Sequence, residues 1–179
     1  RLPGPPEFSM PLVLVLGGTR SGKSRFAVEL ARRLSESGGL PVTLIATAEA
    51  RDEEMVERIR RHQEERPPTW ETLEAPLDLV GALGRARYPT VVVDCLTLWV
   101  ANLLERGLDP LEEAKRFLGA VGESGKRVIA VSNEVGMGIV PANPLARRYR
   151  DLLGGVNALF AERAEVYLLV AGKALRLGA

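Results

Sequence analysis

Residues 17–24 read Gly17-Gly18-Thr19-Arg20-Ser21-Gly22-Lys23-Ser24, a glycine-rich loop with the spacing G-x-x-x-x-G-K-S. Glycines allow successive backbone N–H groups to curl around an anion without Cβ clashes, and the N-terminus of a following helix adds partial positive charge. In this pattern Lys23 reaches the β- and γ-phosphates, and the hydroxyl of Ser24 binds Mg²⁺. The loop therefore predicts a nucleoside triphosphate site.

The sequence on either side of this loop fits the motif. Before it, residues 12–16 form the short apolar run Leu-Val-Leu-Val-Leu, which predicts a buried strand. After it, Phe26, Leu30 and Leu34 recur at helical spacing within a predicted helix over residues 23–36. A strand, the loop and a helix in this order are the context that the motif requires, which argues against a chance match.

The rest of the chain alternates strand-like apolar runs with helical patterns. Alternation of this kind predicts βαβ crossovers, and hence an α/β fold of the P-loop NTPase (RecA-like) class, a mostly parallel sheet with helices on both faces. The polar ends of the strands are expected to meet in one crevice. We predict strands at residues 11–16, 42–46, 90–94, 127–132 and 165–171, a short edge strand at 70–73, and further helices at 52–65, 77–87, 96–105, 111–123 and 144–163.

Bulk properties narrow the class of protein. A formal net charge of +1 argues against a nucleic-acid partner bound by overall charge. The single cysteine, Cys95, excludes an internal disulfide and fits a reducing compartment. No apolar run approaches 18 residues, which excludes membrane insertion and predicts a soluble, cytoplasmic protein. Residues 1–9 resemble expression-vector sequence, so we expect a single nucleotide-binding domain over residues 10–179.

Two further residues are candidates for chemistry. Val91-Val92-Val93-Asp94 places a carboxylate at a strand tip, where it holds Mg²⁺ together with Ser24 or, alternatively, caps the next helix. His62 is the only histidine, and it lies on the same helical stripe as Met55 and Ile59. Periodicity alone favours packing over reactivity for such a histidine, and a single histidine cannot form a histidine-cluster metal site.

Several segments together resemble one family. They are the loop at 17–24, residues 45–48, 52–67 and 94–104, and above all Ser132-Asn-Glu-Val-Gly-Met-Gly-Ile-Val-Pro141, continued by residues 145–157. The family is the bifunctional adenosylcobinamide kinase/adenosylcobinamide-phosphate guanylyltransferase of cobalamin biosynthesis, and the resemblance extends from Met10 almost to the C-terminus. The sequence lacks the N-K-x-D motif by which regulatory GTPases recognise guanine, which argues against that class of protein. Its near-neutral net charge argues against a nucleic-acid motor.

The resemblance implies a function and a set of site residues. The enzyme would phosphorylate the aminopropanol hydroxyl of adenosylcobinamide with ATP or GTP, then transfer GMP from GTP through a guanylyl-histidine to give adenosylcobinamide-GDP. The alternative is a P-loop small-molecule kinase without the transferase step. The partner would be a corrinoid, and family members assemble as homotrimers. By resemblance, His62 is the guanylylated histidine. Together with Lys23 and Asp94 from the motifs it makes up the predicted catalytic residues, and the motifs predict Ser24 and Asp94 as metal ligands. The nucleotide contacts implied by the resemblance are Gly17, Gly18, Thr19, Arg20, Ser21, Gly22, Lys23, Ser24, Ala46, Thr47, Ala48, Gln63, Glu64, Glu65, Arg66, Glu74 and Asp94.

The segment Glu134–Pro144 has two open interpretations. Its glycines and prolines make it a plausible wall for the bulky corrinoid. Equally, it only turns the chain from a strand into the helix over residues 144–163. Arg147, Arg150 and Asp151 follow, and they are candidates for an ion-pair network.

Overall fold

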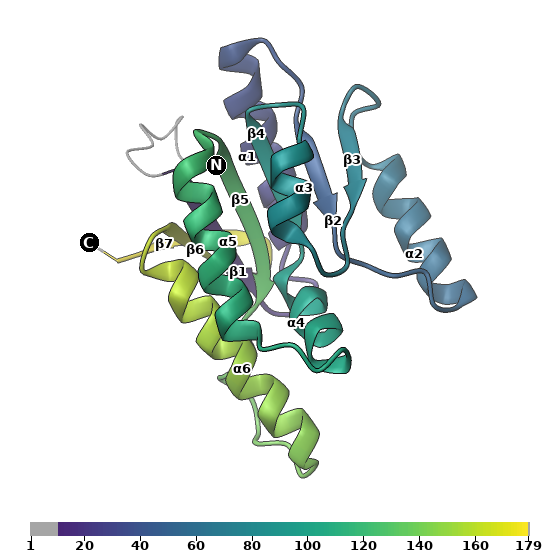
Figure 1. Ribbon diagram of the computed structural model, residues 1–179, viewed down its shortest axis with the longest axis vertical. Helices are drawn as coiled ribbons and strands as arrows, with labels where there is room; N and C mark the ends of the chain where they lie inside the picture. The colour runs from purple at the N-terminus through teal and green to yellow at the C-terminus, as the bar shows by residue number, and fades with distance from the viewer. Residues whose placement is uncertain (1–10, 179) are drawn as a thin grey trace.

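The computed structural model describes residues 11–178, so the expected boundary between the vector-like residues 1–9 and a domain beginning at Met10 lies outside the described residues. A seven-stranded sheet with the order β3-β2-β4-β5-β1-β6-β7 forms the centre of the molecule (Figure 1). In chain order the elements are β1 (Leu12–Gly17), α1 (Lys23–Gly38), β2 (Thr43–Ala46), α2 (Glu53–Glu64), β3 (Glu71–Glu74), α3 (Leu79–Arg85), β4 (Thr90–Asp94), α4 (Leu96–Glu105), α5 (Pro110–Ser124), β5 (Arg127–Asn133), α6 (Pro144–Ala161), β6 (Glu165–Val170) and β7 (Lys173–Leu177).

Strands β1 to β6 pair in parallel, which confirms the predicted α/β class. The predicted edge strand at residues 70–73 is also confirmed, because β3 forms one edge of the sheet. The strand at the other edge, β7, was not predicted from the sequence. There β7 runs antiparallel to β6 after a turn in which Ala171 and Gly172 have φ values of 50° and 79°. Alanine seldom adopts positive φ, so this hairpin lacks the usual sequence signal.

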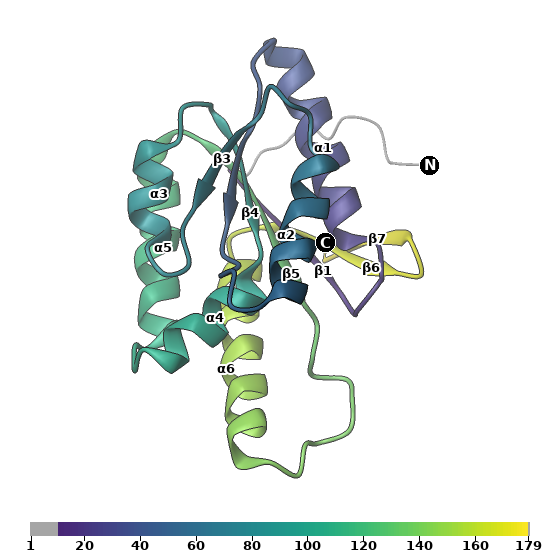
Figure 2. The same ribbon diagram turned by 90° about the vertical axis from the view of Figure 1, so that its right-hand side faces the viewer.

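Two apolar layers hold the helices on the sheet. Helix α1 covers one face through Phe26 and Leu30, which pack with Val13 and Val15 of β1. Helices α3 to α6 cover the other face, where Trp99 is among the largest buried side chains. Figure 2 shows the sheet between α1 on one side and α3 and α5 on the other. Buried strands of this kind are apolar on both faces, as their sequences are.

Helix α2 differs from the others because none of its residues is buried. It stands beyond the β3 edge of the sheet (Figure 1). Contacts within the helix stabilise it. Asp52 caps the N-terminus because its side chain accepts a hydrogen bond from the Met55 N–H at 2.7 Å. Arg60 pairs with Glu57 and Glu64 one turn away on either side. Among residues 11–178, no helix has the length and hydropathy needed to cross a membrane.

Candidate functional site

The polar ends of the strands meet at the carboxyl edge of the sheet, as predicted. The register places Gly17 of β1 opposite Asn133 of β5. It also places Ala46 of β2 between Asp94 of β4 and Glu74 of β3. Since β5 lies between β1 and β4, one strand separates the glycine-rich loop from Asp94. A crevice at this edge is where open α/β sheets bind ligands.

Two glycines of the loop are required by its backbone. Gly22 has a φ of 91°, and a Cβ there would lie 3.3 Å from the Cα of Gly172. A Cβ on Gly17 would collide with the Ser21 side chain and lie 2.9 Å from the Leu169 carbonyl oxygen. Both positions therefore exclude larger residues, which is the physical basis of the glycine pattern.

The loop is fixed at its base and open at its tip. The carbonyl of Ser21 accepts from the Gly172 N–H at 2.8 Å, whereas residues 18–20 are exposed. Lys23 Nζ donates to the Gly18 carbonyl oxygen at 3.1 Å, which holds the ammonium group over the loop. Among the described residues the buried hydroxyl of Ser21 has no hydrogen-bond partner. An unpaired donor and an ammonium group in one loop fit a bound anion.

Asp94 is the electrostatic centre of this edge. Burial raises the pKa of its carboxyl, and the positive charges of His62, Arg66 and Lys23 oppose that rise. These three side chains come from the end of α2, the segment after it and the glycine-rich loop, so the fold brings three separate segments near one carboxylate. The Asp94–Cys95 peptide bond is cis.

His62 lies in the last turn of α2 with an exposed side chain. The packing interpretation that periodicity favoured is therefore wrong for this residue, although Met55 and Ile59 on the same stripe are half-buried. The imidazole is exposed and lies within electrostatic range of Asp94.

A cleft of about 460 Å³ opens between the end of α2 and β3. Gln63, Glu64 and Arg66, which are predicted nucleotide contacts, line it together with Trp70 and Thr72. Burial lowers the pKa of the Arg66 guanidinium while Asp94 and Glu65 act in the opposite direction. Arg66 therefore lines the cleft and also interacts electrostatically with the carboxylate of Asp94. The cleft is large enough for a small ligand. Trp70 and Thr72 were missed because neither belongs to a recognisable motif.

Thr47 connects two strand ends. It is fully buried, and its hydroxyl donates to the Cys95 carbonyl oxygen at 2.7 Å and accepts from the Cys95 N–H at 2.9 Å. Its own N–H donates to the Asp94 carbonyl oxygen at 3.1 Å. The only hydroxyl proton of Thr47 is thus used within the protein, and this side chain holds the backbone around Asp94. A nucleotide contact at Ala46, Thr47 or Ala48 stays a prediction.

We expect Thr47→Val to lower the free energy of unfolding by about 2–3 kcal/mol, because it leaves a buried N–H and a buried carbonyl without a partner. Urea denaturation measures this change. The matched control is Thr72→Val on the exposed side of β3, which should change stability by less than about 0.5 kcal/mol. Equal effects at the two positions would show that the buried hydroxyl contributes nothing special.

Within the single chain, Arg147 and Arg150 hold the segment after β5 through its carbonyl groups instead of pairing with Asp151. An ion-pair network between subunits, the other form of this prediction, stays a prediction. Arg147 Nη1 donates to the carbonyl oxygens of Pro141 and Ala142, each at 2.8 Å. Arg150 Nη2 donates to the Gly136 carbonyl oxygen at 2.6 Å. The exposed segment is therefore tied to α6 by side chains that follow it in the sequence.

The thiol of Cys95 is inert. Burial, reinforced by the charge of Asp94, raises its pKa to about 11. A thiol with that pKa stays protonated near neutral pH and is a poor nucleophile.

Comparison with known proteins gives consistent matches over nearly the whole chain. A family model for cobinamide kinase / cobinamide phosphate guanyltransferase matches residues 13–177. The bifunctional adenosylcobalamin biosynthesis protein CobP of Pseudomonas aeruginosa is 48% identical over 170 residues, which cover 89% of this chain and 92% of that protein. The bifunctional adenosylcobalamin biosynthesis protein CobU of Salmonella typhimurium is 37% identical over 187 residues, covering 93% and 99%. The Escherichia coli CobU protein is 37% identical over 184 residues, with the same coverage.

Proposed function

Because the chain belongs to the cobinamide kinase / cobinamide phosphate guanyltransferase family, it is a bifunctional enzyme of cobalamin biosynthesis, and we propose how its residues divide the two reactions. This family is the one that the sequence motifs resemble. We infer that the acceptor is adenosylcobinamide, that ATP or GTP donates the phosphoryl group, and that GTP donates GMP through a covalent intermediate on His62.

In the kinase reaction the γ-phosphoryl group passes to the hydroxyl of the aminopropanol arm. Positioning and charge neutralisation supply most of the catalysis of such a transfer. The loop at residues 17–24 cradles the phosphates, and Lys23 leaves its contact with the Gly18 carbonyl to bind the β- and γ-phosphates. The γ-phosphate of the donor nucleotide and the hydroxyl of the acceptor then come together at the open end of the loop.

Ser24 and Asp94 are the residues that would hold Mg²⁺. Mg²⁺ usually takes one or two protein carboxylates together with substrate phosphates, rather than a cage of protein ligands. The site offers one such carboxylate, because Asp94 ends β4 and a single strand separates it from the loop that carries Ser24. When bound, Mg²⁺ neutralises charge on the phosphate oxygens. The buried Asp94 carboxylate would gain a cation beyond the three protein cations that already act on it.

In the guanylyl transfer a nitrogen of the neutral His62 imidazole attacks the α-phosphorus of GTP. A P–N bond forms as the bond from the α-phosphorus to the bridging oxygen breaks, and pyrophosphate leaves with that electron pair. An oxygen of adenosylcobinamide phosphate then attacks the same phosphorus, and the P–N bond breaks to restore the imidazole. Lys23 and Arg66, with the exposed Arg20, would neutralise the departing pyrophosphate.

The observation that supports this proposal is the exposed side chain of His62 in the last turn of α2, directly before the residues Gln63, Glu64 and Arg66 that line the cleft. His62 and Lys23, from different segments of the chain, both influence the carboxyl of Asp94. Since Lys23 is where the phosphates of a nucleotide would bind, the imidazole is a candidate to reach them. A kinase without the transferase step has no use for an exposed imidazole there.

Labelled GTP tests the covalent step. We expect α-phosphate-labelled GTP with Mg²⁺ to leave label on the denatured protein, and γ-labelled GTP to leave none. The adduct should release GMP in mild acid, since a phosphorus–nitrogen bond to imidazole is acid-labile, and chelation of Mg²⁺ should prevent its formation. Absence of α-label, or equal labelling from both positions, would rule out the guanylyl intermediate and favour the kinase-only alternative.

The acceptor is a bulky corrinoid, and the segment Glu134–Pro144 is proposed as part of its wall. The Glu134 N–H donates to the Gly17 carbonyl oxygen at 3.1 Å, so the segment starts at the base of the loop. It then exposes Met137 and Ile139, which are 77% and 96% accessible. An apolar surface of this kind beside a polar site fits a large, partly apolar ligand. We further propose the homotrimer that the resemblance implies.

A further inference from the structure

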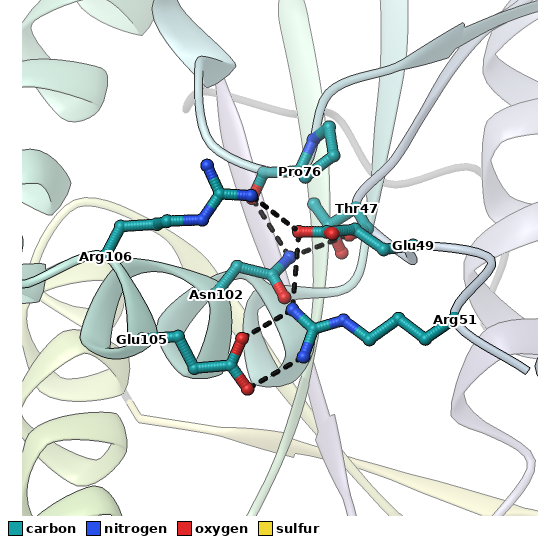
Figure 3. Close-up of polar contacts among 7 residues, drawn as sticks. All are labelled: Thr47, Glu49, Arg51, Pro76, Asn102, Glu105 and Arg106. Carbon is teal, nitrogen blue, oxygen red and sulfur yellow. Dashed lines mark hydrogen bonds and ion pairs between the residues drawn. The ribbon is translucent and has the colours of Figure 1, made fainter.

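The linker of residues 47–52, between β2 and α2, decides where α2 begins. Because α2 has no buried residue, packing along its length does little to fix its direction. The position and direction of the first turn of α2 are therefore determined by the contacts that hold the linker. Besides the contacts of Thr47 with Asp94 and Cys95, the linker is held by Asn102 and Glu105 of α4 and by Arg106, which follows that helix (Figure 3).

Asn102 of α4 holds the first end of the linker. This side chain is buried, and its Nδ2 donates to the carbonyl oxygen of Thr47 at 2.9 Å and to that of Pro76 at 3.1 Å. The contact joins β2 and the segment after β3 to the same helix. It anchors residue 47 but leaves residues 48–52 to be held by other groups.

A chain of four alternating charges holds the second end. Arg51 forms a two-pronged contact with Glu105 at the end of α4: Nη1 donates to Oε1 at 2.8 Å and Nη2 to Oε2 at 2.5 Å. Glu49 Oε1 lies 3.5 Å from Arg51 Nη2 and 4.0 Å from Arg106 Nη2. This oxygen atom is buried, and within residues 11–178 it has no hydrogen-bond partner. Figure 3 shows the carboxylate of Glu49 between the two guanidinium groups. A planar guanidinium fits a carboxylate in one orientation, so this contact defines a direction as well as a distance.

This contact lies immediately before the helix that carries His62. Asp52, the next residue, is the N-cap of α2. His62 lies about 15 Å farther along the helix axis. A small rotation at the linker therefore moves the imidazole by several ångströms, and reaction rates depend on the placement of the reacting atoms.

We propose that the Arg51–Glu105 pair, supported by Glu49 and Arg106, is a positioning element that directs α2 so that His62 reaches the α-phosphate. The inference rests on the proposed role of His62. It concerns guanylyl transfer and not the kinase reaction, whose chemical groups lie on the loop, on Lys23 and on Asp94.

The test compares Arg51→Ala, Glu105→Ala and the double variant with wild type in the full chain. The readouts are the single-turnover rate of GMP-adduct formation from α-labelled GTP and the kinase rate at saturating ATP. Each single variant should form the adduct about two- to fivefold more slowly, with the kinase rate changed by less than about twofold. The double variant should be no slower than the singles, because the two residues act as a unit. Arg51→Lys, which keeps the charge but loses the planar fork, should fall between wild type and Arg51→Ala.

The control is Arg116→Ala, which removes a similarly exposed ion pair with Glu113 on α5, far from the linker in the sequence. It should leave both rates unchanged. Equal adduct rates in wild type and Arg51→Ala would overturn the inference. So would parallel losses of both activities, which indicate general damage to the fold, or single effects that multiply in the double variant.

Failure of the proposed function gives a different result. An adduct that persists in His62→Asn shows that the nucleophile is another residue, and it overturns the inference together with the role of His62. An adduct that depends on His62 but forms equally fast without Arg51 overturns the positioning role alone.

Discussion

We expect His62→Asn to lose guanylyl transfer by at least about a thousandfold while the kinase reaction continues, because the substitution removes the nucleophile but none of the phosphate-binding groups. Asparagine retains polarity and similar bulk, and His62 is exposed, so the fold should not change. The measurement is twofold: the α-label retained on denatured protein, and the conversion of adenosylcobinamide to its phosphate. The first should vanish and the second should persist.

Arg58→Ala is the matched control for this variant, since Arg58 is also exposed on α2. It should form the adduct at close to the wild-type rate. Survival of the adduct in His62→Asn would show that another residue is the nucleophile. Loss of both activities in His62→Asn would mean instead that His62 contributes to nucleotide binding in general.

The second large effect is expected for Asp94→Asn, which should reduce both activities at least about a hundredfold. Both transfers need charge neutralisation on the phosphates, and the substitution removes the carboxylate that would hold Mg²⁺ with Ser24. Addition of excess Mg²⁺ should not restore either rate. Retention of kinase activity would exclude Asp94 as the metal ligand. The alternative role as a helix cap is not the arrangement found, because the N-cap of α4 is Cys95 and, in the described part of the chain, this helix start has no side-chain capping hydrogen bond.

The same substitution should stabilise the fold. Burial raises the pKa of the Asp94 carboxyl, so the folded state binds a proton more tightly than the unfolded state does. Stability from this group is therefore complete at low pH and is lost as pH rises toward and through the raised pKa. Asparagine carries no charge and avoids this loss, so its advantage over wild type should grow with pH, to about 0.5–2 kcal/mol.

Urea denaturation between about pH 4 and about pH 8 measures this advantage. Asp109→Asn is the control, because Asp109 is an exposed helix N-cap, a position where asparagine serves equally well. It should show little change of stability at either pH. A lower stability of Asp94→Asn at the higher pH would mean that the cations around Asp94 outweigh its burial.

Much of the fold follows from local patterns. The strand at Thr90–Asp94 and the helix at Leu96–Glu105 have the predicted bounds. Helix α1 continues to Gly38, two residues beyond the prediction, because its end is set by Gly39 in the left-handed conformation. The missed strand β7 is short and exposed, and its turn uses an alanine at positive φ, so no periodic or turn signal marks it.

The candidate site divides in the same way. The glycine-rich loop and the strand that ends at Asp94 are contiguous stretches, and their chemistry is visible in the residue types and spacing. His62 carried no such signal: periodicity favoured packing, and only resemblance to a family indicated reactivity. The structure shows an exposed imidazole, which local pattern did not predict because α2 stands away from the sheet.

By itself, then, the sequence determined the class of fold, the phosphate-binding loop and, through its motifs, the family. These depend on residues close together in the chain, where hydrophobic period, glycine spacing and strand ends are local properties. Only the tertiary structure decided which cations surround Asp94 and what holds the start of α2. Those contacts join residues far apart in the chain, such as Arg51 and Glu105, 54 positions apart. They depend on the order of strands in the sheet, which no local pattern specifies.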